Sequence, residues 1–128
     1  MTRHSLNNAN LPTPVGYARA VRASGAALIV TSMTAPVGAD GDVIGVRDIR
    51  LQTQTALGNI ADILEQNGGT LADVAKVTAY VVEQKDLASV MTVIAEVFGD
   101  SPPAVAVVVV GGLPNKDFLV ELDAIAMI

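Results

Sequence analysis

Apolar residues recur at helical spacing in two segments of the chain. The first stripe follows Asp48, a good N-cap residue, and consists of Leu57, Ile60, Ala61 and Leu64, at i, i+3, i+4 and i+7. Gly68 and Gly69 are expected to end this helix. The second stripe precedes Gly99, which stops it, and consists of Leu87, Val90, Met91, Ile94, Ala95 and Phe98. The spacing therefore predicts two amphipathic helices.

Other segments carry the composition of strands or of loops. Strands are predicted at 26–33, 74–82, 104–110 and 118–127. The polar, Asn- and Pro-containing residues 1–14 predict an arm or loop, and the Gly and Asp residues of 35–42 predict another loop. The expected order is strand, helix, strand, helix, strand, strand. The connection GGLPNKD between the last two strands suggests an antiparallel hairpin, although it is long for one.

The segment from Ala104 to Val110 is apolar without interruption, whereas a half-solvated strand alternates polar and apolar residues. Both faces of this strand are therefore expected to be covered. The two predicted helices cover one face of a sheet, so other subunits are the simplest cover for the second face. The alternative is a larger core within one chain, covered by an element that the pattern does not reveal.

Composition narrows the class of protein. The 128 residues suggest one domain spanning 1–128, and the chain contains no cysteine, which excludes disulfides, thiolate nucleophiles and zinc–cysteine sites. The formal net charge of −5 argues against a general nucleic-acid binder. No apolar run approaches the length of a membrane span, and the first residues lack the apolar stretch of a signal peptide. A cytoplasmic protein without a membrane partner is expected.

Two candidate acid or base residues lie on the last predicted strand. Glu121 and Asp123 share one face of it, as i and i+2. A carboxylate inside such an apolar strand is costly to bury, its pKa rises, and it can act as a general acid or base. The alternative is a sheet rim where both carboxylates meet water or pair with arginine. His4 lies in the predicted arm, where a surface role is expected, and no clustered ligands predict a metal site.

Short motifs along almost the whole chain resemble the RidA family, also called YjgF or endoribonuclease L-PSP. The matching pieces, in chain order, are Pro14-Val15-Gly16-Tyr17, Ala20-Val21, Gln54-Thr55, Leu57, Asn59-Ile60, Leu64, Gly68-Gly69, Val77-Thr78, Phe98, Pro103-Ala104, Leu113-Pro114 and Glu121 to Ala126. Each piece is weak alone, but their order and spacing are specific.

The resemblance implies an α+β fold like that of chorismate mutase, in which a mixed sheet carries two helices on one face. It implies a homotrimer with three ligand clefts between subunits. It also implies hydrolysis of reactive enamines and imines, such as 2-aminoacrylate and 2-iminobutanoate, to 2-keto acids and ammonia without a cofactor. The family glutamate that positions the attacking water corresponds to Glu121, and the tyrosine that lines the cleft corresponds to Tyr17.

This sequence departs from the family pattern at the remaining site positions. Val105 stands where the family has the arginine that binds the substrate carboxylate, and Met91 stands in place of an asparagine. Arg19 takes the place of the Gln or His that follows the tyrosine. The Ser-Gly-Gln segment of the family corresponds to Thr31-Ser32-Met33. These exchanges suggest a more apolar cleft and an altered small-molecule substrate.

Three functions stay open from the sequence. One is imine or enamine hydrolysis on an altered substrate, a second is another reaction on the same scaffold in a specialised pathway, and the third is ligand binding without catalysis. An endoribonuclease role fits poorly with the acidic charge balance.

Overall fold

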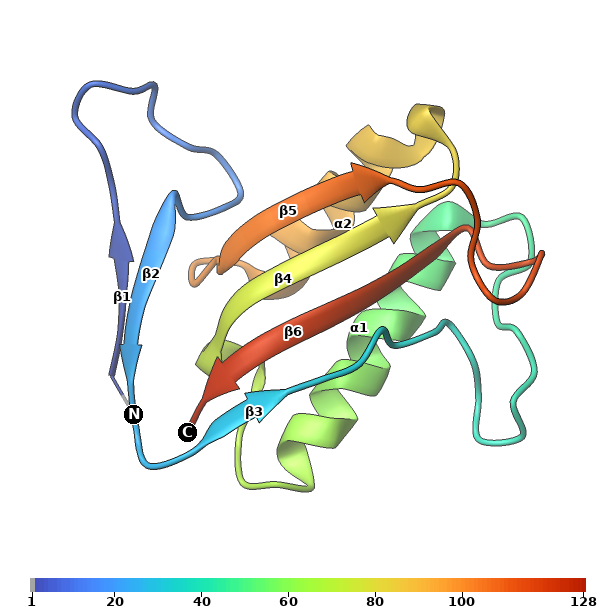
Figure 1. Ribbon diagram of the computed structural model, residues 1–128, viewed down its shortest axis with the longest axis horizontal. Coiled ribbons are helices and arrows are strands. Elements are labelled where there is room, and N and C mark those ends of the chain that lie inside the picture. Colours follow the sequence, from blue (N-terminus) through green and yellow to red (C-terminus); the bar gives the residue numbers. More distant parts are fainter. Residues whose placement is uncertain (1) are drawn as a thin grey trace.

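Two helices lie against one face of a four-stranded sheet, and a separate two-stranded ribbon stands beside it (Figure 1). The computed structural model describes residues 2–128. The strands are β1 (Thr2–Leu6), β2 (Ala20–Ser24), β3 (Leu28–Val30), β4 (Val74–Val81), β5 (Ala104–Val109) and β6 (Val120–Met127). The helices are α1 (Ile49–Glu65) and α2 (Leu87–Phe98), with short 3₁₀ turns η1 (Leu71–Asp73) and η2 (Gln84–Asp86). The predicted α+β class with both helices on one face is confirmed.

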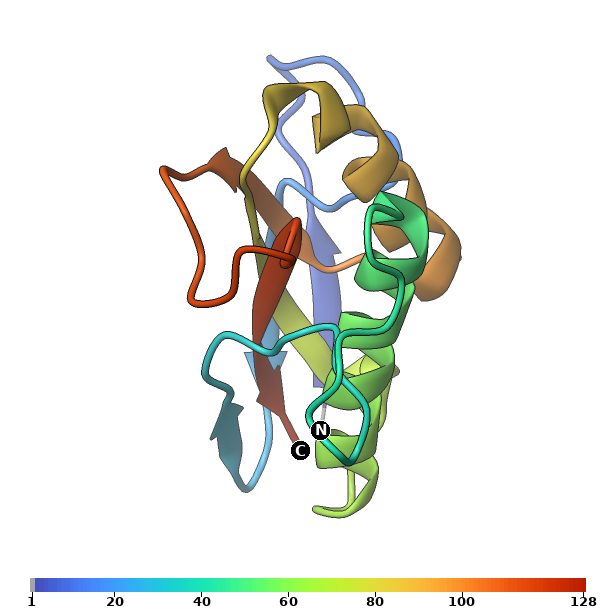
Figure 2. The ribbon, with the colours of Figure 1, turned by 90° about the vertical axis from the view of Figure 1, so that its right-hand side faces the viewer.

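The core lies between the helices and the sheet, as the view along the sheet edge shows (Figure 2). Helix α1 contributes Leu57, Ile60 and Leu64, which are fully buried, whereas Ala61 of the predicted stripe is half-buried. Alternate residues of β4 and β6 face these side chains, because successive side chains of a strand point to opposite faces. The fully buried strand residues are Val74, Val77, Ala79, Val81, Val120 and Leu122. Among residues 2–128, no helix is long and apolar enough to cross a membrane.

Helix α1 starts where the sequence predicts. The Oδ1 atom of Asp48 accepts a hydrogen bond from the backbone N–H of Leu51 at 3.1 Å. Replacing Asp48 by alanine removes this cap and is expected to lower the free energy of unfolding by about 1 kcal/mol, measured by urea denaturation. Asp62→Ala, on an exposed position of the same helix, is the control. Equal losses in both variants would contradict the capping role.

Sheet order differs from the predicted hairpin. The order is β3-β6-β4-β5, so β4 separates the two strands that GGLPNKD connects. Strand β5 pairs parallel to β4, and β6 pairs antiparallel to β4 on its other side. The hairpin prediction is wrong because the α2 crossover brings β5 back beside β4, which leaves β6 only the far edge of β4.

The structure also corrects the prediction that the N-terminal residues form only an arm or loop. Within the predicted loop 1–14, residues Thr2–Leu6 form β1, which pairs antiparallel with β2; residue 1 lies outside the described residues. Both strands are exposed along most of their length, so neither shows the apolar alternation that reveals a strand. His4 pairs with Arg22 in this ribbon. The guanidinium of Arg3 donates to the carbonyl oxygen of Ser101 at 3.0 Å and ties the ribbon to the turn before β5.

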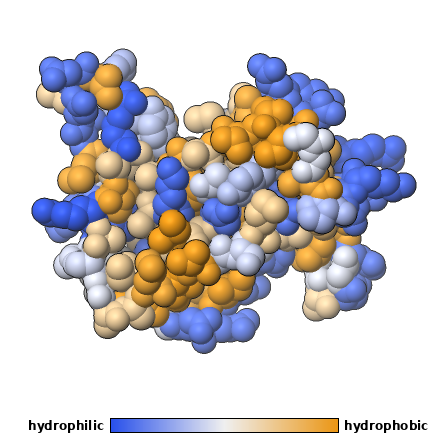
Figure 3. Space-filling view, viewed as in Figure 1, coloured by the Kyte–Doolittle hydropathy of each residue, from blue (hydrophilic) through white to orange (hydrophobic). Residues whose placement is uncertain are grey.

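The sheet face opposite the helices is open in the single chain. Val108 on β5 is 41% exposed and Val30 on β3 is 64% exposed, and both belong to this face by register. The space-filling view shows apolar patches over this face (Figure 3). Val105 and Val107 point to the other side and pack against the core. On one face of β5, Val105 and Val107 are thus partly covered by their own chain, whereas the other face is uncovered.

Candidate functional site

A groove of about 430 Å³ lies between α2 and the edge of β5. It brings together three predicted site residues, Tyr17, Met91 and Val105, and continues into a smaller cavity that reaches Val107. The other residues along the groove are Val15, Gly16, Thr92, Ile94, Ala95 and Glu96. We call this cavity the α2 groove. Sequence reasoning did not predict Val15, Thr92 or Glu96, because only the packing of the 15–17 segment on α2 reveals them.

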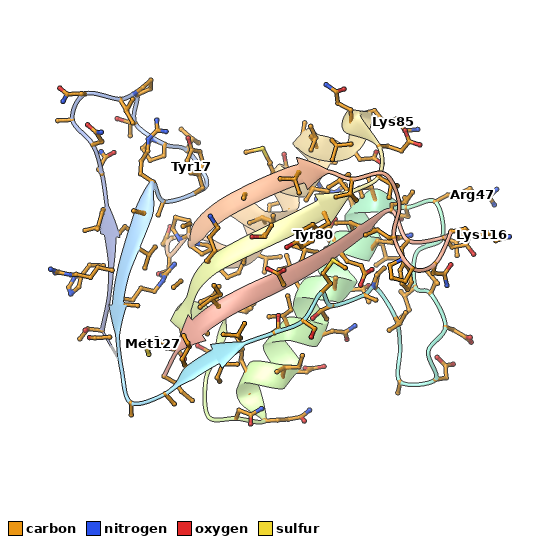
Figure 4. The ribbon with its side chains drawn as sticks, viewed as in Figure 1. Tyr17, Arg47, Tyr80, Lys85, Lys116 and Met127 are labelled. Carbon is orange, nitrogen blue, oxygen red and sulfur yellow. The ribbon has the colours of Figure 1, made fainter. Side chains whose placement is uncertain are left out.

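Gly16 allows the segment that carries Tyr17 to approach α2 closely. Its φ of +78° lies in the left-handed region, and a Cβ atom there would stand 2.9 Å from the Cβ atom of Ala95. The backbone N–H of Ala18 donates to the carbonyl oxygen of Pro103 at 2.9 Å, which fixes the same segment against the start of β5. Figure 4 labels Tyr17 at this end of the sheet.

Apolar walls dominate the α2 groove. Met91 is 44% exposed to solvent, and Val105 lines the groove together with it. The single charged residue among those that line the groove is Glu96, whose carboxylate forms an ion pair with Arg50 at 2.8 Å. An anionic group in this groove would therefore lose hydration, gain no cationic partner from the lining residues and face a carboxylate.

Arg19 lies beside the groove rather than within its lining. Its guanidinium stands 5.8 Å from the centre of the Tyr17 ring, and its Nη2 atom donates to the carbonyl oxygen of Pro12 at 2.6 Å. The cation is therefore held against Tyr17 and the preceding loop. A cation at this distance from an aromatic ring is attracted to the face of the ring.

Glu121 lies on the open face of the sheet, opposite the side that Val105 faces. Its cross-strand neighbour is Tyr80, which in turn neighbours Val108 on β5. Glu121 is only 4% exposed, and its Oε1 atom is buried without a hydrogen-bond partner in the described part of the chain. Burial raises the pKa of this carboxyl, because the charged form loses its hydration. The expected buried carboxyl is therefore present, and the alternative of a hydrated rim position is not.

Asp123 has a different environment from Glu121. The Tyr80 hydroxyl donates to its Oδ2 atom at 2.7 Å, and this hydrogen bond, with burial and the negative charge, raises the pKa of Tyr80. Figure 4 labels Tyr80 in the middle of the sheet. The carboxylate of Asp123 is thus already satisfied by a neighbour, which leaves Glu121 as the carboxyl with a free oxygen. Tyr80 could not be predicted as its neighbour without the strand register.

The segment Thr31–Met33 runs beside the part of β6 that follows Glu121. The Oγ1 atom of Thr31 accepts from the backbone N–H of Ala124 at 2.9 Å, and Thr34 pairs with Leu122 through two backbone hydrogen bonds. The Ser32 carbonyl accepts from the Thr34 hydroxyl, and Met33 is exposed. The Thr31 hydroxyl is therefore engaged with the backbone of β6.

The predicted site residues thus form two groups. Tyr17, Met91 and Val105 share the α2 groove with Arg19 at its side, whereas Glu121 and Thr31–Met33 lie along β6. Because Val105 and Glu121 face opposite sides of the sheet, a single chain does not bring the two groups together.

Comparisons with known proteins agree on one family. The family model described as "Endoribonuclease L-PSP" matches residues 8–128. The RutC family protein PH0854 of Pyrococcus horikoshii is 42% identical over 118 residues, which cover 91% of each chain. The crystal structure of YyfB from Yersinia pestis, a protein of unknown function of the conserved Rid family, superposes with a TM-score of 0.92 at 28% identity and full coverage of both chains. The YjgF gene product of E. coli is 30% identical, with a TM-score of 0.71 over 97% of this chain and 98% of that one.

Proposed function

The chain belongs to the endoribonuclease L-PSP family, which includes the Rid and YjgF proteins, and from this premise we propose that it hydrolyses a reactive imine or enamine. The observation that carries the proposal is Glu121, a buried carboxyl with a raised pKa and an unpartnered oxygen. A carboxylate of this kind is a stronger base than an exposed one and is ready to hold a water molecule.

The reaction needs only water and proton transfers. Glu121 accepts a proton from water as the oxygen attacks the imine carbon, which gives a carbinolamine. The protonated carboxyl returns this proton to the nitrogen, which makes the carbinolamine neutral. The carboxylate then takes the proton of the carbinolamine hydroxyl and passes it to the same nitrogen, the C–N bond breaks as the C=O bond forms, and a carbonyl compound and ammonia leave. An enamine enters the same path after it tautomerises to the imine. All electron pairs stay within the substrate and water, so nothing is oxidised or reduced. This route therefore requires no redox cofactor.

The cleft forms between subunits of a homotrimer. The α2 groove with Tyr17 lies at one edge of the sheet, and Glu121 lies on the open face, so one subunit offers the groove and its neighbour offers the carboxyl. The exposed apolar side chains of the open face, such as Val30 and Val108, support association through that face. We place this assembly in the cytoplasm.

The substrate differs from the 2-imino acids that arginine-bearing members of the family hydrolyse. Val105 and Met91 offer apolar contacts where those members bind a carboxylate, and the charged lining residue Glu96 is a carboxylate paired with Arg50. The substrate therefore carries an apolar group at this position, or places its anionic group elsewhere.

An assay with two classes of imine tests the proposal. An amine oxidase generates neutral imines in situ, an amino-acid oxidase generates 2-imino acids, and the rate of imine loss is followed with and without the protein. We expect acceleration with neutral imines above that with 2-imino acids. No acceleration with any imine would remove hydrolysis as the function and leave ligand binding.

Trimer formation is a separate prediction. Light scattering on a sizing column is expected to give about three times the chain mass of 13.2 kDa. Val108→Asp places a charge on the open face and is expected to shift the protein toward monomers. Val97→Asp, on the exposed side of α2, is the matched control and is expected to stay trimeric. A wild-type monomer at micromolar concentration would contradict the shared cleft.

A further inference from the structure

Gln52 is a fully buried amide on α1 that takes part in no contact of the proposed reaction. Its Nε2 atom donates to the carbonyl oxygens of Gly45 at 3.0 Å and Asp117 at 2.9 Å, and its Oε1 atom accepts from the backbone N–H of Leu119 at 2.8 Å. One side chain therefore ties the loop before α1 and the loop before β6 to the helix. Its last contact, Leu119, lies two residues before Glu121.

Asn59 makes the equivalent contact on the other side. Its Nδ2 atom donates to the carbonyl oxygens of Ala35 at 3.0 Å and Val37 at 2.9 Å. This segment directly follows Thr34, whose backbone pairs with Leu122, the residue after Glu121. Asn59 therefore anchors the strand segment that borders Glu121 from the side of β3.

The two amides share one face of the helix. They are seven residues apart, or two turns, and about 10 Å along the axis at 1.5 Å per residue. Together they fix the backbone on both sides of Glu121, before it through Leu119 and beside it through Thr34. The Oε1 atom of Glu121 has no hydrogen-bond partner among the described residues, so no hydrogen bond to this atom fixes the carboxyl, and its place depends on the backbone that carries it.

We propose that Gln52 and Asn59 are positioning residues that hold the Glu121 carboxyl in its buried place. The proposal rests on the function proposed above for Glu121, but its physical content is the position and hydration of one carboxyl. Loss of an amide frees the adjoining backbone, admits water to Glu121 and misplaces the base. A misplacement of about 1 Å is enough to cost roughly a hundredfold in rate.

The variant Gln52→Met keeps the volume of the side chain and removes its three hydrogen bonds. The variant Asn59→Ala removes the hydrogen bonds to Ala35 and Val37. Because Asn59 is half-buried, this second variant is less of a risk to folding. Thr53→Val is the matched control, because Thr53 is equally buried on the same helix but donates only to the Ile49 carbonyl of its own helix. The readout is the titration of the Glu121 side-chain carboxyl by ¹³C NMR, which needs no substrate.

We expect Gln52→Met and Asn59→Ala each to lower the pKa of Glu121 toward its ordinary value, to speed amide exchange at Leu119 and Leu122 respectively, and to reduce kcat roughly ten- to a hundredfold. Thr53→Val is expected to lower stability without moving the Glu121 titration. An unchanged titration in both amide variants would overturn the proposal. A lowered pKa in a protein that hydrolyses no imine would keep the positioning role and reject the proposed reaction.

Discussion

Replacing Glu121 with glutamine is expected to lower kcat/KM for imine hydrolysis by about 10²–10⁴-fold, which is the usual contribution of a general base. Glutamine keeps the size of the side chain and its ability to contact water, but it accepts no proton at neutral pH. Asp123→Asn is the control on the same face of β6, because the Asp123 carboxylate already receives a hydrogen bond from Tyr80. Its expected loss of activity is smaller. Wild-type activity in Glu121→Gln would retire Glu121 as the base.

The same variant is expected to gain stability at neutral pH. Burial raises the pKa of Glu121 in the folded chain above its value in the unfolded chain. The folded state therefore loses stability as pH rises through the folded pKa, because a buried carboxyl has to ionise. Glutamine has no such cost. Denaturant titrations at several pH values should give Glu121→Gln a higher free energy of unfolding than the wild type at pH 7. The difference should vanish below about pH 4, where the glutamate is neutral in both the folded and the unfolded chain.

Replacing Val105 with arginine is expected to raise the rate of 2-iminobutanoate hydrolysis about ten- to a hundredfold. A charge-assisted hydrogen bond to the substrate carboxylate contributes about 1.5–3 kcal/mol, and each 1.36 kcal/mol corresponds to tenfold in rate. The side chain at this position lines the α2 groove together with Tyr17 and Met91. The wild type is expected to hydrolyse 2-iminobutanoate slowly, by the same arithmetic.

Val109→Arg is the matched control for this gain, since it adds the same charge to an exposed residue of the same strand face outside the groove. A gain in both variants would point to a general effect of charge on substrate attraction. Fast hydrolysis of 2-iminobutanoate by the wild type would show that another group binds the carboxylate, and the inference of an apolar substrate would fail. Arg19 would then be the first residue to test, because its guanidinium already lies beside Tyr17.

The helices and the central strands were predictable because their side chains report their surroundings. The stripe around Ile60 and the cap at Asp48 are local signals, and both correspond to contacts within or directly beneath α1. The β1–β2 ribbon carries no such signal, since its exposed residues do not alternate in polarity. The predicted pairing of the last two strands was wrong. The segment GGLPNKD shows that these strands are connected, but it does not show that β4 lies between them, which depends on the α2 crossover.

The sequence suggests candidate site residues, but it does not reveal how they are arranged. A carboxyl in the apolar strand of Glu121 is visible in the sequence, and the structure confirms its burial. That Val105 and Glu121 face opposite sides of the sheet follows only from the register of β4 with both neighbours. The role of Gln52 was not predicted, because its hydrogen bonds go to loops around Gly45 and Asp117 that are distant in sequence. Only the folded structure brings these loops to the side chain.

The position of β6 between β3 and β4 has a consequence for the order in which a growing chain can fold. During synthesis, β3, β4, β5 and both helices leave the ribosome before residues 120–127 do. Until then β4 has an unpaired edge and β3 has no partner strand, and such edges invite pairing with other nascent chains. The helices and the β4–β5 pair can form early, whereas the sheet is completed only when its final strand inserts into the waiting gap.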